Sequence, residues 1–275
     1  MGRRLFSYHD SWPLSNIFTG DIFTGAFHTM PALQDTETLV MTMHERFNID
    51  IWRVWEKHFG DAPGVPAPLL YPNSKGNCIL FIGLNPSFPE FVKLPAPLEG
   101  ARYQEYMEWR GGNADQARIL QIESETTSLY PYFRKFQEIE REVGVSQFHV
   151  DLFCYRETSQ KTIISKMFRD FESHNLENFG RQQLDLAVNF IRDLKPKVIV
   201  VCNATASRIF CKEFQINLLS DFDAEAGYHS KRVSNSISIP VFFSSMLTGQ
   251  RALDTFSYQR LKWHIKRALE KHHRA

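Results

Sequence analysis

Two polar residues lie at the ends of apolar runs in this chain and carry side chains suited to chemistry. Asn85 follows the run 78–82, and Asp151 lies near the end of the run 148–153. An amide carbonyl can orient a water molecule, and a carboxylate accepts hydrogen bonds. Together they predict a site that positions water against a polar ligand. Structural alternatives are that Asn85 makes an Asn-Pro turn or caps a helix, and that Asp151 pairs with Arg156 or a lysine.

Further candidates occupy the polar or glycine-bearing segments that follow four apolar runs. These segments are 83–87, 154–158, 202–205 and 244–251. Because ligands of parallel sheets bind beyond the carboxyl ends of the strands, we expect these segments to meet at one edge. Ser245 is a third catalytic candidate. The candidates for substrate binding are Gly83, Leu84, Pro86, Ser87, Phe88, Tyr155, Asn203, Gln250 and Arg251.

Strands and helices are predicted to alternate along most of the chain. Apolar runs at 78–82, 148–153, 198–201 and 239–243 predict buried strands. Apolar spacing of three and four residues predicts helices at 130–143, 184–194, 204–214 and 258–271. Repeated β-then-α units predict an α/β fold, a three-layer α/β/α sandwich around a four-stranded, mostly parallel sheet.

The first 66 residues are predicted to be a helical N-terminal extension, 1–66, of a main domain that comprises 67–275. Apolar residues recur at every fourth position from Leu39 to Phe59, and Gly60 ends this pattern. Four prolines between 61 and 72 predict a stiff connector into the main domain.

Composition restricts the possible classes of protein. The chain has 275 residues, of which 43% are hydrophobic and 23% charged, which excludes a disordered chain, a coiled coil and a disulfide-stapled miniature. Its 32 basic and 31 acidic residues give a net charge of +1, so that only a local patch can attract nucleic acid. The 23 Phe residues predict a thick aromatic core or an aromatic-lined site.

Several common motifs are absent from the sequence. It has no apolar run long enough to span a membrane and no secretory signal, so we expect a cytoplasmic protein. Its four cysteines are widely spaced without a C-x-x-C pair, which favours buried thiols over a metal site. Without a phosphate-binding loop, a G-x-G-x-x-G or a G-x-S-x-G motif, nucleotide hydrolysis, dinucleotide redox chemistry and ester hydrolysis lack their usual sequence support.

The segment 81–87, Phe-Ile-Gly-Leu-Asn-Pro-Ser, resembles the first motif of the uracil-DNA glycosylase superfamily. It is most similar to the Gly-x-Asn-Pro form of the mismatch-specific and single-strand-selective branches. As architecture, the resemblance extends over about residues 70–272 and implies a four-stranded parallel sheet with helices on both faces. Only the first motif is a sharp match.

The resemblance implies a hydrolase that cleaves a base–sugar N-glycosidic bond with water, without a metal or cofactor. This reaction passes through an oxocarbenium-like sugar and needs donors aimed at the departing base, together with a pocket for a flipped-out base. Asn85 matches the residue that positions the water. Asp151 stands where the family usually has an Asn that reads the base. Because an ionised carboxylate only accepts hydrogen bonds, the expected base offers donors, as a purine-like lesion does, and is not plain uracil.

The family's His-Pro-Ser signature after the last strand is absent, and Ser-Ser-Met at 244–246 takes its place. Ser245, Gln250 or Arg251 would then have to donate to the departing base, with the cationic Arg251 as the strongest candidate. The Met-Leu pair at 246–247 either forms an apolar wedge that enters a duplex or makes the turn into the terminal helix.

DNA, single- or double-stranded, is the expected partner, and no membrane or metal partner is expected. Residues 251–275 hold seven basic and two acidic residues, so the terminal helix either holds phosphates, with Tyr258 and Trp263 nearby, or presents an ordinary solvated face. The aromatic residues of 103–112 either stack on a base or belong to a partly buried helix. Two other functions stay open: a catalytically inactive nucleic-acid-binding module of the same fold, and an enzyme that acts on free nucleosides or nucleotides.

Overall fold

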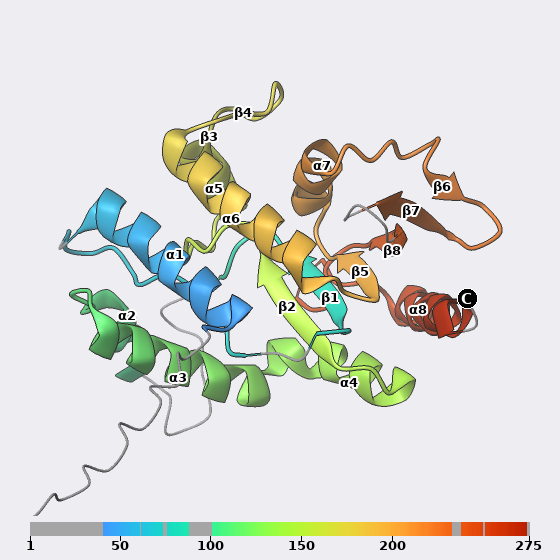
Figure 1. Ribbon diagram of the computed structural model, residues 1–275, viewed down its shortest axis with the longest axis horizontal. Coiled ribbons are helices and arrows are strands. Elements are labelled where there is room, and N and C mark those ends of the chain that lie inside the picture. The colour runs from blue at the N-terminus through green and yellow to red at the C-terminus, as the bar shows by residue number, and fades with distance from the viewer. Residues whose placement is uncertain are drawn as a thin grey trace, which may run out of the picture. The chain divides into compact units, whose positions relative to one another are not determined.

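A six-stranded, mostly parallel sheet forms the centre of the computed structural model (Figure 1). The structure describes residues 41–60, 62–73, 76–87, 101–232, 238–249 and 251–273. Strands β2 (Gln147–Asp151), β1 (Ile79–Gly83), β5 (Val198–Val201) and β8 (Ser238–Phe243) are parallel neighbours in that order. Strand β7 (Tyr228–Arg232) pairs antiparallel with β8, and β6 (Phe222–Asp223) pairs antiparallel with β7.

The prediction of four strands is therefore wrong in number, although the four predicted apolar runs do form the four parallel strands. The sequence of β7 is Tyr-His-Ser-Lys-Arg, so it has no apolar run and gives no signal for a buried strand. Only the two-residue β6 lies beyond it in the sheet. Gly227, with a φ of +76°, precedes β7 in the turn from β6. Such polar strands near a sheet edge form through pairing, which hydrophobic patterns do not display.

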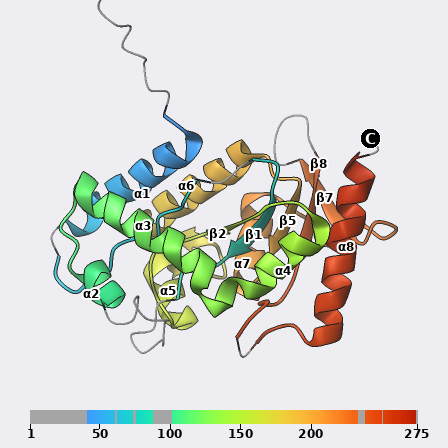
Figure 2. The same cartoon turned by 90° about the horizontal axis from the view of Figure 1, so that it is seen from below.

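Helices cover both faces of the sheet (Figures 1 and 2), because alternate side chains of a strand point to opposite sides. Leu80 and Ile82 pack into one cluster with α1 (Met43–Phe59), α5 (Gln160–Met167), α6 (Asn178–Leu194) and α7 (Ala204–Glu213). Ile79 and Phe81 pack into a second cluster with α4 (Arg134–Val143) and α8 (Thr255–His273). The order of layers is helix, sheet, helix, as the sequence predicts.

The remaining elements lie between the predicted ones. The short helix α2 (Ala101–Met107) is followed by α3 (Asn113–Leu129) and a 3₁₀ turn, Pro131–Phe133. The predicted helix 130–143 therefore consists of this turn and α4, which ends at the left-handed Gly144 (φ +69°). Strands β3 (Phe168–Asp170) and β4 (Asn175–Leu176) form a separate antiparallel pair between α5 and α6.

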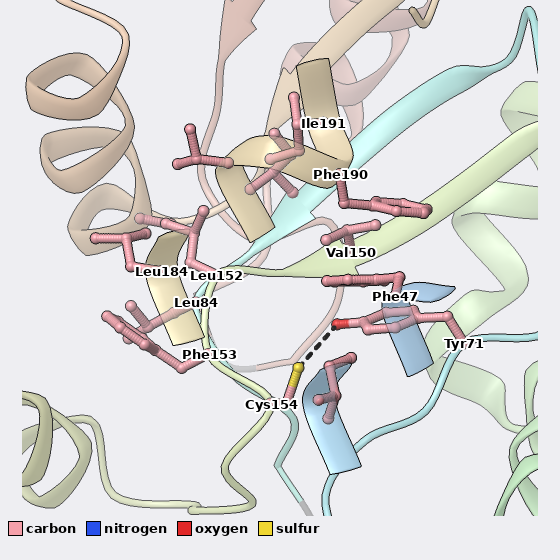
Figure 3. Packing of buried hydrophobic residues seen from close by; sticks show 14 of the residues in the cluster. Phe47, Tyr71, Leu84, Val150, Leu152, Phe153, Cys154, Leu184, Phe190 and Ile191 are labelled. Carbon is pink, nitrogen blue, oxygen red and sulfur yellow. Dashed lines mark hydrogen bonds between the residues drawn. The ribbon is translucent and has the colours of Figure 1, made fainter. Parts of the chain in front are cut away.

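Helix α1 is part of the compact unit Met41–Ala275 that contains the sheet. It begins with a capping box between Thr42 and Glu45. Figure 3 shows its Phe47 beside Phe190 of α6, and the two rings are stacked with centroids 4.2 Å apart. The predicted helix within 1–66 is thus an integral layer of the fold from Met43 onward. Residues 1–40 of the predicted extension lie outside the described residues.

Among the described residues, no helix is long and apolar enough to cross a membrane.

Candidate functional site

A cavity of about 540 Å³ runs along β2, from Ser146 and Gln147 at its start to Asp151 at its carboxyl end, where it reaches Asn85 in the segment after β1. Its volume lies within the range of small-molecule sites, roughly 300–1,000 Å³. We call it the β1–β2 cavity, and its lining includes Asn85, Ser87, Tyr132, His149, Asp151 and Met246. The two residues on which the predicted chemistry depends, Asn85 and Asp151, therefore line the same space.

The Asn85 side chain braces the segments that follow β1 and β2. Its Nδ2 donates to the carbonyls of Glu157 at 2.7 Å and of Tyr155 and Pro86 at 3.3 Å each. Three carbonyls around one nitrogen fix the orientation of the amide, because only the NH₂ group can donate. The Asn85 Oδ1 accepts no hydrogen bond from a described residue. The Nδ2 of Asn85 thus holds the two segments together, while its side-chain carbonyl is available to hold a water molecule.

Asp151 occupies space that Gly83 leaves open. The two residues are paired in the parallel register of β1 and β2. A Cβ atom on residue 83 would lie 2.1 Å from the Asp151 Oδ1 and 3.1 Å from the His149 Nε2. The missing side chain of Gly83 is therefore what allows the Asp151 carboxyl to fold over the end of β1.

Burial makes Asp151 a weak acid. Its exposed fraction is 4%, and burial raises the pKa of its carboxyl to about 8, with Arg156 acting in the opposite direction and Glu123 raising the pKa further. Neither carboxyl oxygen makes a hydrogen bond with a described residue, while the Asp151 amide donates to the Tyr71 Oη at 3.0 Å. The raised pKa of Asp151 favours the protonated form at neutral pH over the ionised, acceptor-only form expected from the sequence, in which its burial was not visible.

Arg156 does not form the ion pair with Asp151 that the structural alternative required. Its guanidinium pairs with Glu123, donates to the Ala67 carbonyl at 3.0 Å and lies over the Tyr106 ring, 3.9 Å from the centroid. Tyr106 also donates to Glu123. This buried network forms one side of the cavity, since both Glu123 and Arg156 line it.

His149 lines the cavity and was not among the candidates predicted from the sequence. It lies two positions before Asp151 on the same face of β2, and alternation along the strand was the signal that could have revealed it. The rings of Tyr132, Phe133 and Phe136 surround it, with centroids 5.9, 5.8 and 5.5 Å away. Burial lowers the pKa of its imidazole to about 4, so it is neutral at pH 7. Its buried Nε2 has no hydrogen-bond partner among the described residues.

Several predicted substrate-binding residues do not line the cavity. Leu84 belongs to the core and is 5% exposed. Tyr155 packs against the ring of Trp55, with the two centroids 5.8 Å apart. Asn203 caps α7 by accepting from the Thr205 and Ala206 amides at 2.8 and 3.1 Å. Hydrogen bonding and packing within the protein account for all three side chains.

The segment after β8 brings only one side chain to the cavity. Met246 lines it, whereas Leu247 is buried in the second cluster, so the two do not form a shared wedge. Ser245 and Arg251 are exposed and are not among the lining residues. Pro86 and Ser87 do line the cavity. Phe88 and Gln250 lie outside the described residues.

The aromatic residues of 103–112 are core residues where the structure describes their side chains. Tyr106 is fully buried, and Trp109 is 4% exposed and donates to the Val65 carbonyl at 2.7 Å. These two rings are therefore not available for stacking on a base, and of the two interpretations the partly buried helix is the one that fits them.

The exposed face of α8 combines aromatic and basic side chains. Phe256, Arg260, Trp263 and Arg267 recur at helical spacing and are exposed, and we call them the α8 stripe. The Arg267 guanidinium lies 5.3 Å from the centroid of the Trp263 ring. Lys262, in contrast, is buried and pairs with Glu138 and Glu142, so it is not available to a phosphate.

No protein-family model matches this chain, and no curated protein matches its sequence.

Proposed function

We propose that this protein is a DNA glycosylase-like hydrolase, related in design to the uracil-DNA glycosylase superfamily, that cleaves a base–sugar N-glycosidic bond. One observation carries the proposal: Asn85, whose Oδ1 accepts no hydrogen bond from a described residue, and Asp151 line the same cavity beside the carboxyl ends of β1 and β2. The four contiguous parallel strands and the helices on both faces agree with the architecture that the resemblance implies.

In the proposed reaction, a water held by the Asn85 Oδ1 attacks the anomeric carbon of the sugar. The new C–O bond replaces the C–N bond, whose electron pair leaves with the base, and the water proton finally resides on the departing base. The transition state resembles an oxocarbenium ion, so a positioned water and polar groups at the base stabilise it. A cavity of about 540 Å³ is large enough for a base rotated out of the stack.

Polar groups near the departing base come from β2 in this proposal. The sequence-based candidates Ser245 and Arg251 do not line the cavity, whereas Asp151 and His149 do. A neutral carboxylic acid can donate a hydrogen bond, and so can one nitrogen of a neutral imidazole. Asp151 and His149 therefore supply the hydrogen-bond donors to the departing base in this chain, which lacks the family's His-Pro-Ser segment.

DNA is the proposed partner, and the α8 stripe is the proposed contact surface. Arg260 and Arg267 are exposed and make no ion pair with a described residue, so their charges are available to phosphates. Trp263 is 54% exposed and Phe256 80%, and exposed rings offer platforms on which unpaired bases stack. We also assign the protein to the cytoplasm, an assignment supported by four free cysteines.

A catalytically inactive binding module is the second candidate, favoured because the expected donors Ser245 and Arg251 are not among the residues that line the cavity. The deciding experiment is a panel of oligonucleotides with different damaged or deaminated bases, incubated with the wild type and with Asn85→Ala. The proposal expects an abasic product from the wild type and a loss of about 100-fold or more in the variant. Binding of DNA without base release supports the module, and release from free nucleosides alone supports an enzyme of nucleoside metabolism.

A further inference from the structure

We propose that Asp151 contacts the ligand as a neutral carboxylic acid, with the His149 Nε2 beside it, and that together they select a ring edge on which a hydrogen-bond donor adjoins an acceptor. This inference rests on the proposed function for its ligand class, a nucleobase. It is argued from two buried polar side chains that line the β1–β2 cavity and make no hydrogen bond with a described residue through the Asp151 carboxyl or the His149 Nε2.

Among the described residues, no cation forms an ion pair with Asp151. The titratable and charged groups that face it are Tyr71 before β1, Glu123 of α3, Tyr132 of the 3₁₀ turn, His149 of β2, and Cys154 and Arg156 after β2. Arg156 is the one cation among them, and its charge is already matched by Glu123. An unpaired buried carboxylate is costly, so the group keeps its proton instead. The raised pKa of Asp151, about 8, agrees with this geometry.

His149 is neutral for a similar reason. Aromatic rings surround it, and none of the described residues gives its Nε2 a hydrogen bond. Both Asp151 Oδ1 and His149 Nε2 lie around the point where Gly83 lacks a Cβ, at 2.1 and 3.1 Å from it. The two groups are therefore close enough to contact one small planar ring. A buried polar atom without a hydrogen-bond partner destabilises the folded protein, and a ligand that supplies the missing hydrogen bond removes this cost.

The neutral form of Asp151 determines which ring edge it fits. A carboxylic acid carries one O–H donor next to one carbonyl acceptor, and so pairs with a cyclic amide or amidine edge through two parallel hydrogen bonds. An ionised carboxylate carries two acceptors and fits an edge with two donors. The base edge expected from the sequence offers donors to an ionised Asp151. A neutral Asp151 instead fits an edge with a donor beside an acceptor, as uracil has.

The first test measures the protonation state of Asp151 without any ligand. The side-chain carboxyl of Asp151 is followed by ¹³C NMR as a function of pH, with Asp151→Asn used to assign the resonance. We expect a midpoint between pH 7 and 9, and a midpoint below pH 6 overturns the inference. This measurement does not depend on base release, so it distinguishes the inference from the proposed function.

The second test measures binding of hypoxanthine, which has an N–H beside a carbonyl, and of 1-methylhypoxanthine, in which a methyl blocks the N–H. We expect the methyl group to weaken binding at least tenfold. Asp151→Asn, which keeps a donor and an acceptor, should bind hypoxanthine within about threefold of the wild type at pH 6.5. At pH 9 the wild type should bind at least tenfold more weakly than at pH 6.5, and the variant should weaken less, only by as much as hypoxanthine itself loses its N–H proton. Equal binding of both bases, no binding of either, or loss of binding in Asp151→Asn overturns the inference.

Asp193→Asn serves as the matched control, because Asp193 is exposed at the surface of α6 and is not among the residues that line the cavity. It should bind both bases as the wild type does at both pH values. Thermal unfolding of each variant verifies that a change in binding does not come from loss of the fold. Base release by an enzyme whose Asp151 is ionised would support the proposed function and overturn only this inference.

Discussion

Gly83 and Asp151 are register partners at the ends of two parallel strands, and the carboxyl of one fills the space above the other. A Cβ on residue 83 would lie only 2.1 Å from the Asp151 Oδ1. The glycine in the Gly-x-Asn-Pro segment therefore has a definite physical role here, which is to admit an acidic side chain from the neighbouring strand. Asn85, two residues after Gly83 in the same segment, lines the cavity.

Gly83→Ala should displace the Asp151 carboxyl and abolish ligand binding in the cavity. His149 stands 3.1 Å from the added carbon, so Asp151 cannot simply move toward it, and we expect a loss of about 1–3 kcal/mol in the free energy of unfolding. Urea denaturation and binding of hypoxanthine measure the two effects. Gly76→Ala is the matched control, since nothing lies within 4 Å of a Cβ at that position. Equal behaviour of the two variants would contradict the contact.

The sequence was sufficient to predict the parallel strands and most of the helices, because long apolar runs and helical periodicity depend on local pattern. It also predicted that Asn85 and Asp151 lie at one edge, because the carboxyl ends of neighbouring parallel strands lie side by side. It could not predict that Asp151 is buried without an ion partner, because Arg156 is committed to Glu123 by tertiary packing. The polar strand β7 likewise depends on pairing with its neighbours β8 and β6 in the sheet. The capping role of Asn203, in contrast, involves only the nearby Thr205 and Ala206 amides, so its place before the predicted helix 204–214 was a local signal for it.

Asp151→Asn should stabilise the protein increasingly as the pH rises from about 4 to about 8. In the wild type the folded state keeps the proton up to a pKa of about 8, whereas the unfolded chain releases it near its ordinary value. The folded state thus binds more protons, and the free energy of unfolding falls with pH by up to roughly 1 kcal/mol per unit from this group. Asparagine has no such dependence, so the difference between variant and wild type should vanish near pH 4.

Urea denaturation of both proteins at pH 4.5, 6, 7 and 8 measures this difference. Asp193→Asn, at an exposed position of α6, should show no comparable trend. A stabilisation by Asp151→Asn that is the same at every pH would mean that the folded state does not hold the proton on Asp151.

Glu123→Gln should destabilise the fold and lower the pKa of Asp151. The side chains of Glu123 and Arg156 are 7% and 4% exposed, so removing the carboxylate leaves a buried guanidinium without its counter-charge, at a cost of about 3–5 kcal/mol. The pKa of Asp151 should fall, because Glu123 raises it and the freed Arg156 charge lowers it. Denaturation and ¹³C NMR titration of the Asp151 carboxyl give the two values. Glu125→Gln, on the same helix and partly exposed, is the control and should leave both unchanged.

Substitutions in the α8 stripe should weaken binding to single-stranded DNA without altering the cavity. Trp263→Ala removes a 54% exposed ring, and loss of one stacked base costs about 1–3 kcal/mol, which is roughly 5- to 150-fold in affinity. Arg260→Gln with Arg267→Gln removes two charges, so binding should weaken and the slope of log affinity against log salt should fall by roughly 1–2. Fluorescence anisotropy of a labelled oligonucleotide at several salt concentrations measures both effects.

Arg53→Gln is the matched control for this surface, because Arg53 is also exposed, with a side chain 73% accessible, but lies on α1. Its loss should leave the affinity within about twofold and the salt slope unchanged. Binding of hypoxanthine should stay at the wild-type level in the Trp263 and Arg variants, since none of these residues lines the cavity. If the α8 variants bind DNA as tightly as the wild type while Arg53→Gln weakens it, then the nucleic acid lies across another face, and the basic residues of α8 serve only to solvate the helix.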